Sequence, residues 1–142
     1  MNRAKLAALL ASAEDEGVRR SLLGEHTSLA DAALAYALKD ICLDAWSAEP
    51  ALAVGAAEAL GALASINPSE EIAALRSWAE GIASLVAGQM ERAVAHLEDA
   101  ESRFQRLCLP HTAASTQVSR LIALAMLGRY DEAVEAGLRA RE

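Results

Sequence analysis

Residues 128–134 read GRYDEAV and residues 88–94 read GQMERAV, so two related segments lie 40 positions apart. The dipeptide Ala-Val occurs once more another 40 positions upstream, at 53–54. A regular period of this length is typical of repeat proteins, in which each supersecondary unit stacks on the next to bury its apolar side. The sequence therefore predicts an array of similar units, with function on the surface of the array.

The composition predicts an all-α fold. Hydrophobic residues make up 54% of the 142 residues and aromatic residues 4%. Alanine and leucine, which are strong helix formers, are abundant, and no alternating run of β-branched residues occurs. The longest uncharged apolar run, residues 121–128, is far shorter than the ~20 residues that cross a bilayer. We therefore expect no membrane span.

The charge balance disfavours binding to nucleic acids or to anionic membranes. The net charge is −7, from 20 acidic and 13 basic residues, whereas phosphate groups attract positive charge.

Acidic residues at 14–16 follow the short N-terminal apolar run, where a signal peptide would have its cleavage region. Cys42 and Cys108 are too few for a disulfide framework. These features predict a cytoplasmic protein with reduced thiols.

Capping and turn residues divide the chain into three helix pairs. Ser28 with Asp31, Ser47 with Pro50, and the run 67–70 (NPSE) resemble helix starts, and Gly88 and Gly128 are suited to the turns inside two pairs. The predicted helices are 28–46 and 50–66, 69–87 and 90–107, and 111–127 and 130–142. The corresponding pairs are 28–66, 69–107 and 111–142.

The two ends of the predicted stack differ from its middle. Residues 1–26 carry an apolar stripe but do not match the 40-residue template, so we expect them to form an N-terminal helical cap. The last predicted helix carries an apolar side without a polar cover, formed by Ala133, Val134, Gly137 and Leu138. This side predicts a homo-oligomer formed by end-to-end association or domain exchange.

The turn Gly128-Arg129-Tyr130-Asp131-Glu132-Ala133, with Ala140 beyond it, resembles the turn of the tetratricopeptide repeat (TPR) family. The segment 88–93 matches it with Met90 in place of the aromatic residue, and Gly81, Leu97 and Ala100 fill other family positions. The first copy departs from the family pattern, with Ile41 where a small residue belongs, and the period of 40 exceeds the ~34 of the family. Residues 35–54 and 109–142 also resemble the N-terminal repeat region of bacterial proteins that end in a caspase-like CHAT domain.

This resemblance implies a superhelical solenoid, in which the first helix of each pair lines a concave groove. The positions carried over are Leu38, Cys42, Trp46, Leu75, Trp78, Ile82, Leu85, Val118, Ile122 and Met126. Two interpretations of this apolar stripe stay open. The residues pack between adjacent pairs, or they form a groove for an amphipathic helix or an apolar peptide, anchored by residues one helical turn apart.

The function predicted from these features is a non-catalytic protein interaction scaffold, within a larger bacterial regulatory or CHAT-type protein of which this chain is a fragment. The partner is an unidentified protein or peptide, and no cofactor or metal is expected. One alternative is the sensor arm of a transcription regulator. Another is a hydrolase that uses Cys108 and His111, although a third catalytic group and an oxyanion hole are not evident.

Overall fold

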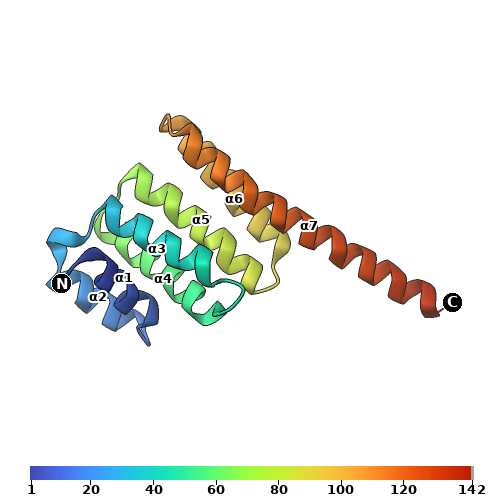
Figure 1. The fold of residues 1–142 in the computed structure, drawn as a ribbon, viewed down its shortest axis with the longest axis horizontal. Coiled ribbons are helices and arrows are strands. Elements are labelled where there is room, and N and C mark those ends of the chain that lie inside the picture. Colours follow the sequence, from blue (N-terminus) through green and yellow to red (C-terminus); the bar gives the residue numbers. More distant parts are fainter. Residues whose placement is uncertain (142) are drawn as a thin grey trace.

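The computed structural model describes the backbone of residues 1–141 and the side chains of that range except 129–134 and 139–141. Its regular structure is helical, with no strand in the described part of the chain, so the all-α prediction is confirmed (Figure 1). The elements are α1 (Arg3–Ser12), α2 (Glu16–Glu25), the short 3₁₀ helix η1 (Thr27–Leu29), α3 (Ala32–Ala45), α4 (Pro50–Ile66), α5 (Glu70–Val86), α6 (Met90–Arg106) and α7 (Pro110–Arg141).

Helices that follow one another along the chain pack side by side. From α3 to α7, each helix contacts the next (Figure 1). In addition, α3 contacts α5 and α5 contacts α7, so the first helices of successive units are neighbours. The apolar residues between these layers form one continuous core, with Leu60, Leu75 and Phe104 fully buried.

The helix starts follow local hydrogen bonding, and α3 and α5 begin later than predicted. The helix predicted from Ser28 begins at Ala32, because the Asp31 carboxylate accepts a hydrogen bond from the Leu34 amide at 3.1 Å. The helix predicted after Asn67 begins at Glu70, because Ser69 is its N-cap and accepts from the Ile72 amide. In both cases the N-cap is the later of the two candidate capping residues.

The turn between α5 and α6 has the predicted glycine geometry. Gly88 adopts a φ of 77°, which is favourable for glycine and unfavourable for other residues. The Gln89 amide donates to the Ser84 carbonyl at 2.9 Å and closes the turn. Further into the pair, a Cβ at Gly81 would lie 2.8 Å from Leu97 Cδ2, so the absent side chain lets the two helices approach closely.

The third predicted pair, 111–142, is not formed. In its place α7 runs from Pro110 to Arg141 as a single helix, and the predicted turn at Gly128 is absent (Figure 1). A helical glycine costs only about 1 kcal/mol relative to alanine, so the continuous backbone hydrogen bonding of a helix overcomes the turn signal. Gly137 and Leu138 are exposed, whereas the Ala133 and Val134 side chains and the whole of Glu142 lie outside the described residues.

The N-terminal helices cover the open side of the α3–α4 pair. Leu6 and Leu10 of α1 are fully buried, and α1 packs against both α3 and α4. Arg19 of α2 is only 4% exposed; it donates to the Leu10 carbonyl at 3.1 Å and pairs with Glu58 of α4 at 2.9 Å. The guanidinium group thus connects α1, α2 and α4.

The close approach of α1 to α4 depends on Gly55, because a Cβ at this position would overlap the backbone carbonyl of Ala11. We expect Gly55→Ala to lower the free energy of unfolding by about 1–3 kcal/mol, since one backbone must move. The matched control is Gly24→Ala, where a Cβ meets nothing within 4 Å. This control should be neutral or stabilising by up to about 1 kcal/mol. Urea unfolding of both variants measures the difference, and equal stability would contradict the packing.

The N-cap of α3 makes stability depend on pH. The hydrogen bond from Arg3 Nε to Asp31, at 2.9 Å, lowers the pKa of the Asp31 carboxyl. A lowered folded-state pKa stabilises the protein above the ordinary pKa of the carboxyl, and this contribution is lost as the pH falls through the folded-state value. Asp31→Asn keeps the capping oxygen, so we expect it to be less destabilising at pH 7 than Asp31→Ala, which also loses a cap worth about 1 kcal/mol.

The measurement is urea unfolding between pH 7 and pH 2. The stability difference between the unchanged chain and Asp31→Asn should shrink as the pH falls through the lowered pKa of the carboxyl. A difference that stays constant over this range would show that the ion pair with Arg3 does not stabilise the fold.

Candidate functional site

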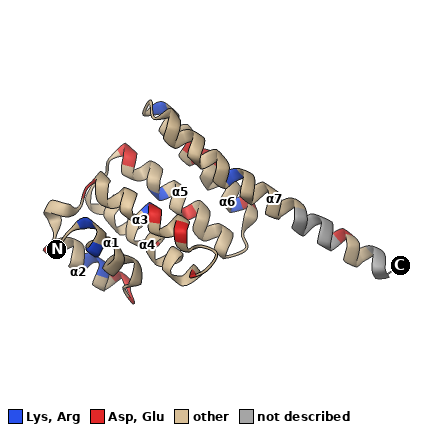
Figure 2. Ribbon diagram, in the orientation of Figure 1, with Lys and Arg blue, Asp and Glu red and all other residues tan. Residues whose placement is uncertain are grey.

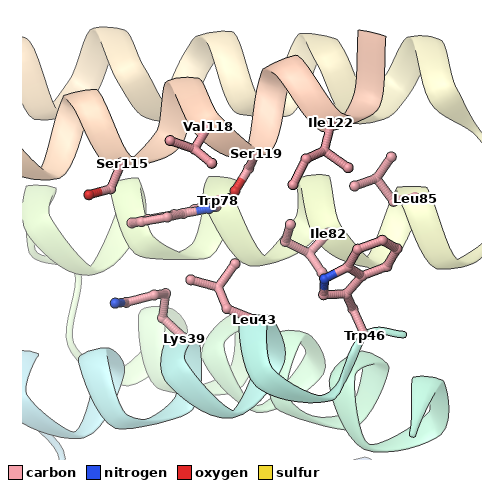
Figure 3. A pocket seen from close by; sticks show the side chains of 10 residues that line it. All are labelled: Lys39, Leu43, Trp46, Trp78, Ile82, Leu85, Ser115, Val118, Ser119 and Ile122. Carbon is pink, nitrogen blue, oxygen red and sulfur yellow. Dashed lines mark hydrogen bonds between the residues drawn. The ribbon is translucent and has the colours of Figure 1, made fainter. Parts of the chain in front are cut away.

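An open groove lies between α3, α5 and α7 and has a volume of about 420 Å³ (Figure 3). Its lining is mostly apolar, and each of the three helices contributes to it. The lining residues are Lys39, Leu43, Trp46, Trp78, Ile82, Leu85, Ser115, Val118, Ser119 and Ile122. The volume is within the usual range of ligand pockets, so the groove is large enough for several side chains of a partner.

The groove follows from helical spacing and from the contacts between first helices. Trp78, Ile82 and Leu85 are separated by four and three positions, so they lie on one side of α5. Lys39 on α3 and Trp46, the C-cap of that helix, are seven positions apart and also share a side. Figure 3 shows these side chains pointing into the space between the helices, with the α7 residues opposite them.

Trp78 forms the floor of the groove and is only 2% exposed. Its Nε1 donates a hydrogen bond to Ser119 Oγ on α7 at 3.1 Å, which satisfies the buried donor. Its ring packs edge-to-face on Phe104, with centroids 6.0 Å apart and planes at 78°. The indole therefore ties α5 to α6 and α7, while the half-buried Trp46 remains at the edge of the groove.

Lys39 is the cationic residue of the groove lining. Its Nζ lies 2.6 Å from Asp40 Oδ1 and 5.0 Å from the centroid of the Trp78 ring. The ammonium group also lies 5.6 Å from the Tyr36 ring, and burial raises the pKa of the Tyr36 hydroxyl. The Lys39 ammonium group is thus held beside the Asp40 carboxylate and the faces of the Tyr36 and Trp78 rings.

Six of the ten predicted groove residues line the groove: Trp46, Trp78, Ile82, Leu85, Val118 and Ile122. The other four do not. Leu38, Cys42 and Leu75 are fully buried in the core, and the half-buried Met126 packs against that core. The predicted stripe thus included residues on the buried side of each helix. Apolar spacing alone does not distinguish side chains that face the open groove from side chains that pack on the next helix.

Sequence reasoning missed Lys39, Leu43, Ser115 and Ser119. The signal for the first two was their spacing of seven and three residues before Trp46, on the same side of the helix. Ser115 and Ser119 are polar, so a pattern of apolar residues does not include them. Ser119 enters the site because it accepts the Trp78 hydrogen bond, which depends on the packing of α7 against α5.

The structure does not assemble a catalytic pair from Cys108 and His111. Both residues are exposed, and no hydrogen bond joins their described side chains. Cys108 lies in the linker before α7 with a φ of 59°. Cys42, in contrast, is buried, and burial raises the pKa of its thiol to about 12. Among the described residues, no three His, Cys, Asp or Glu side chains are grouped to hold a metal ion.

The charged residues do not form an extended basic surface in the described part of the chain. Figure 2 shows Lys and Arg distributed over several helices, with acidic residues interspersed. Several of the basic residues are paired with acids, among them Arg76 with Glu80, Arg103 with Asp99, and Arg120 with Glu101. Within the described residues, no helix combines the length and apolar character that crossing a bilayer requires.

Comparison with family models, curated proteins and solved structures finds no match to this chain.

The different burial of the two cysteines can be measured by alkylation. We expect one thiol, Cys108, to react with iodoacetamide in the native protein at the rate of an ordinary exposed thiol, and Cys42 to react only after unfolding, because the reactive thiolate is suppressed by burial. Mass spectrometry of labelled peptides gives the site. Cys108→Ser is the control and should remove the native-state label. Labelling of Cys42 in the folded chain would contradict its burial.

Proposed function

We propose that this chain is a non-catalytic protein interaction module whose groove between α3, α5 and α7 binds an amphipathic helix or an apolar peptide. The observation that carries the proposal is an apolar lining that stays open: Val118 is 60% exposed and Ile122 is 39% exposed, directly above the Trp78 floor (Figure 3). Apolar residues exposed together at the edge of a concavity are typical of protein interaction sites.

Three polar side chains of the groove already have partners within the chain, so recognition depends mainly on apolar burial. Trp78 donates to Ser119, Ser115 Oγ donates to the His111 carbonyl at 3.1 Å, and Lys39 pairs with Asp40. A partner helix would place apolar residues at positions i, i+3 or i+4, and i+7 against Trp46 and the α7 side chains.

The expected affinity is modest. Three buried anchor side chains contribute about 1.5–3 kcal/mol each, and association costs several kcal/mol of lost freedom. The net result corresponds to a dissociation constant of hundreds of micromolar or weaker.

The sequence resemblance to the TPR family supports the proposal. The period of 40 residues puts α3, α5 and α7 at equivalent positions, and the resemblance in the segments 88–93 and 128–133 favours a module that presents the first helices to a partner. We also propose, from the same resemblance, that the module works inside a larger bacterial regulatory or CHAT-type protein in the cytoplasm.

The test is selection from a displayed library of helical peptides, followed by fluorescence titration with Trp46 and Trp78 as reporters. Selected peptides should carry apolar residues spaced three, four and seven apart. Val118→Glu should weaken their binding at least ten-fold, because it places a charge inside the apolar contact. The matched control is Leu9→Glu on α1, a residue 44% exposed and remote from the groove, which should bind as the unchanged chain does.

Two outcomes would overturn the proposal. One is a library that yields no peptide binding better than about 1 mM. The other is a set of peptides whose affinity is the same for Val118→Glu and for the unchanged chain, since these peptides would bind elsewhere.

A further inference from the structure

The two walls of the groove differ in charge. Figure 3 shows α3 and α7 on opposite sides of a floor formed by α5. On the α7 wall, residues 110–128 contain a single Asp, Glu, Lys or Arg, which is Arg120. This residue pairs with Glu101 of α6 at 3.1 Å and is not part of the groove lining. A partner in the groove therefore meets charged side chains mainly on the α3 side.

The accessible charge on the α3 wall is negative. The side chain of Lys39 is only 15% exposed, whereas that of Asp40 is 63% exposed. The Lys39 ammonium group already has partners, since it lies 2.6 Å from Asp40 Oδ1 and 5.0 Å from the centroid of the Trp78 ring. Asp44 follows Asp40 by one helical turn on the same side of α3 and is exposed as well. A partner therefore meets carboxylates more than the ammonium group.

A third carboxylate lies at the Lys39 end of the groove. Tyr36 is beside Lys39, with 5.6 Å between Nζ and the ring centroid. Burial raises the pKa of the Tyr36 hydroxyl, and the negative charge of Glu71 on α5 raises it further, so this carboxylate is close to the ring. The charge around the α3 wall thus has the same sign as the net charge of the chain, which is −7.

The α7 wall offers an apolar contact that continues outward from the groove. Val118 is 60% exposed, and Leu121, three positions later on the same side of α7, is 62% exposed. A helix that fits between the two walls therefore needs an apolar stripe that extends toward α7. On its other flank it needs side chains that complement carboxylates.

We propose that the occupant of the groove is a basic amphipathic helix, with Lys or Arg residues on the flank that faces Asp40 and Asp44. This inference rests on the proposed function and adds the charge of the partner to it. An acidic helix is disfavoured, because its carboxylates would approach those of α3 while the Lys39 charge is already paired. Apolar burial supplies the affinity, and the complementary charge selects among apolar helices.

The test uses three synthetic helical peptides that share one apolar stripe, with leucine at positions i, i+3, i+4 and i+7. They differ on one flank, at positions i+1, i+5 and i+8, which carry lysine, glutamine or glutamate. Either flank serves, because reversing a helix in the groove exchanges its flanks. Trp46 and Trp78 fluorescence measures binding to the unchanged chain.

We expect the lysine peptide to bind about three- to ten-fold more tightly than the glutamine peptide at low salt, because an exposed ion pair contributes a factor of about 1.4–5. The glutamate peptide should bind more weakly than the glutamine peptide. Both differences should shrink between about 20 mM and about 500 mM salt, since the charges are exposed and screened.

A pair of double variants separates the α3 carboxylates from the net charge of the chain. Asp40→Asn with Asp44→Asn should abolish the preference for lysine and leave the binding of the glutamine peptide unchanged. The matched control is Glu14→Gln with Glu25→Gln, which removes two exposed carboxylates near the N-terminus and should keep the preference.

Three outcomes would overturn the inference. Equal binding of the three peptides, or tighter binding of the glutamate peptide, overturns it and leaves the groove as an apolar binding site. A lysine preference that the two double variants retain equally overturns it too, because the effect then comes from the net charge. If none of the three peptides binds, the inference fails together with the proposed function.

Discussion

The structure depends on one constraint: no helix of this chain buries its apolar side alone, so each helix must approach its neighbour closely. The approach is set by small residues at two places. Gly55 lets α1 contact α4 against the Ala11 carbonyl, and Gly81 lets Leu97 of α6 fill the space above α5. Around these contacts lie the fully buried leucines of the core. Dispersion and apolar burial thus stabilise a layered array without disulfides or metals in its described part.

The groove is a consequence of the same layering. Since α3 contacts α5 and α5 contacts α7, three first helices lie next to one another and expose their outward sides together. Trp78 then does two things: its ring fills the space between α5, α6 and α7, and its N–H fixes Ser119 in the groove wall. What remains open above it is the apolar side of α7, where Val118 is 60% exposed and Ile122 is 39% exposed.

Much of the fold could be predicted from the sequence, and the failures have identifiable causes. Pro50 and Gly88 correctly predicted a helix start and a turn, because both restrict the backbone wherever they occur. The start of α3 was wrong by four residues, since Ser28 and Asp31 both resemble caps and it is the Asp31 carboxylate that accepts from the Leu34 amide. The turn at Gly128 was wrong for a related reason. A glycine that permits a turn does not require one, whereas Gly88 turns because α6 packs on α5.

The sequence by itself determined the helical class, the 40-residue spacing and most helix boundaries, because periodicity, caps and helix propensity act over a few residues. Through the resemblance to the TPR family, it also indicated six of the residues that line the groove. Only the tertiary structure decided which half of each apolar stripe is buried, how Lys39 and Ser119 enter the site, and that α7 continues as one helix. These outcomes depend on contacts between residues far apart in the chain, and the energies of such contacts are not encoded in any local pattern.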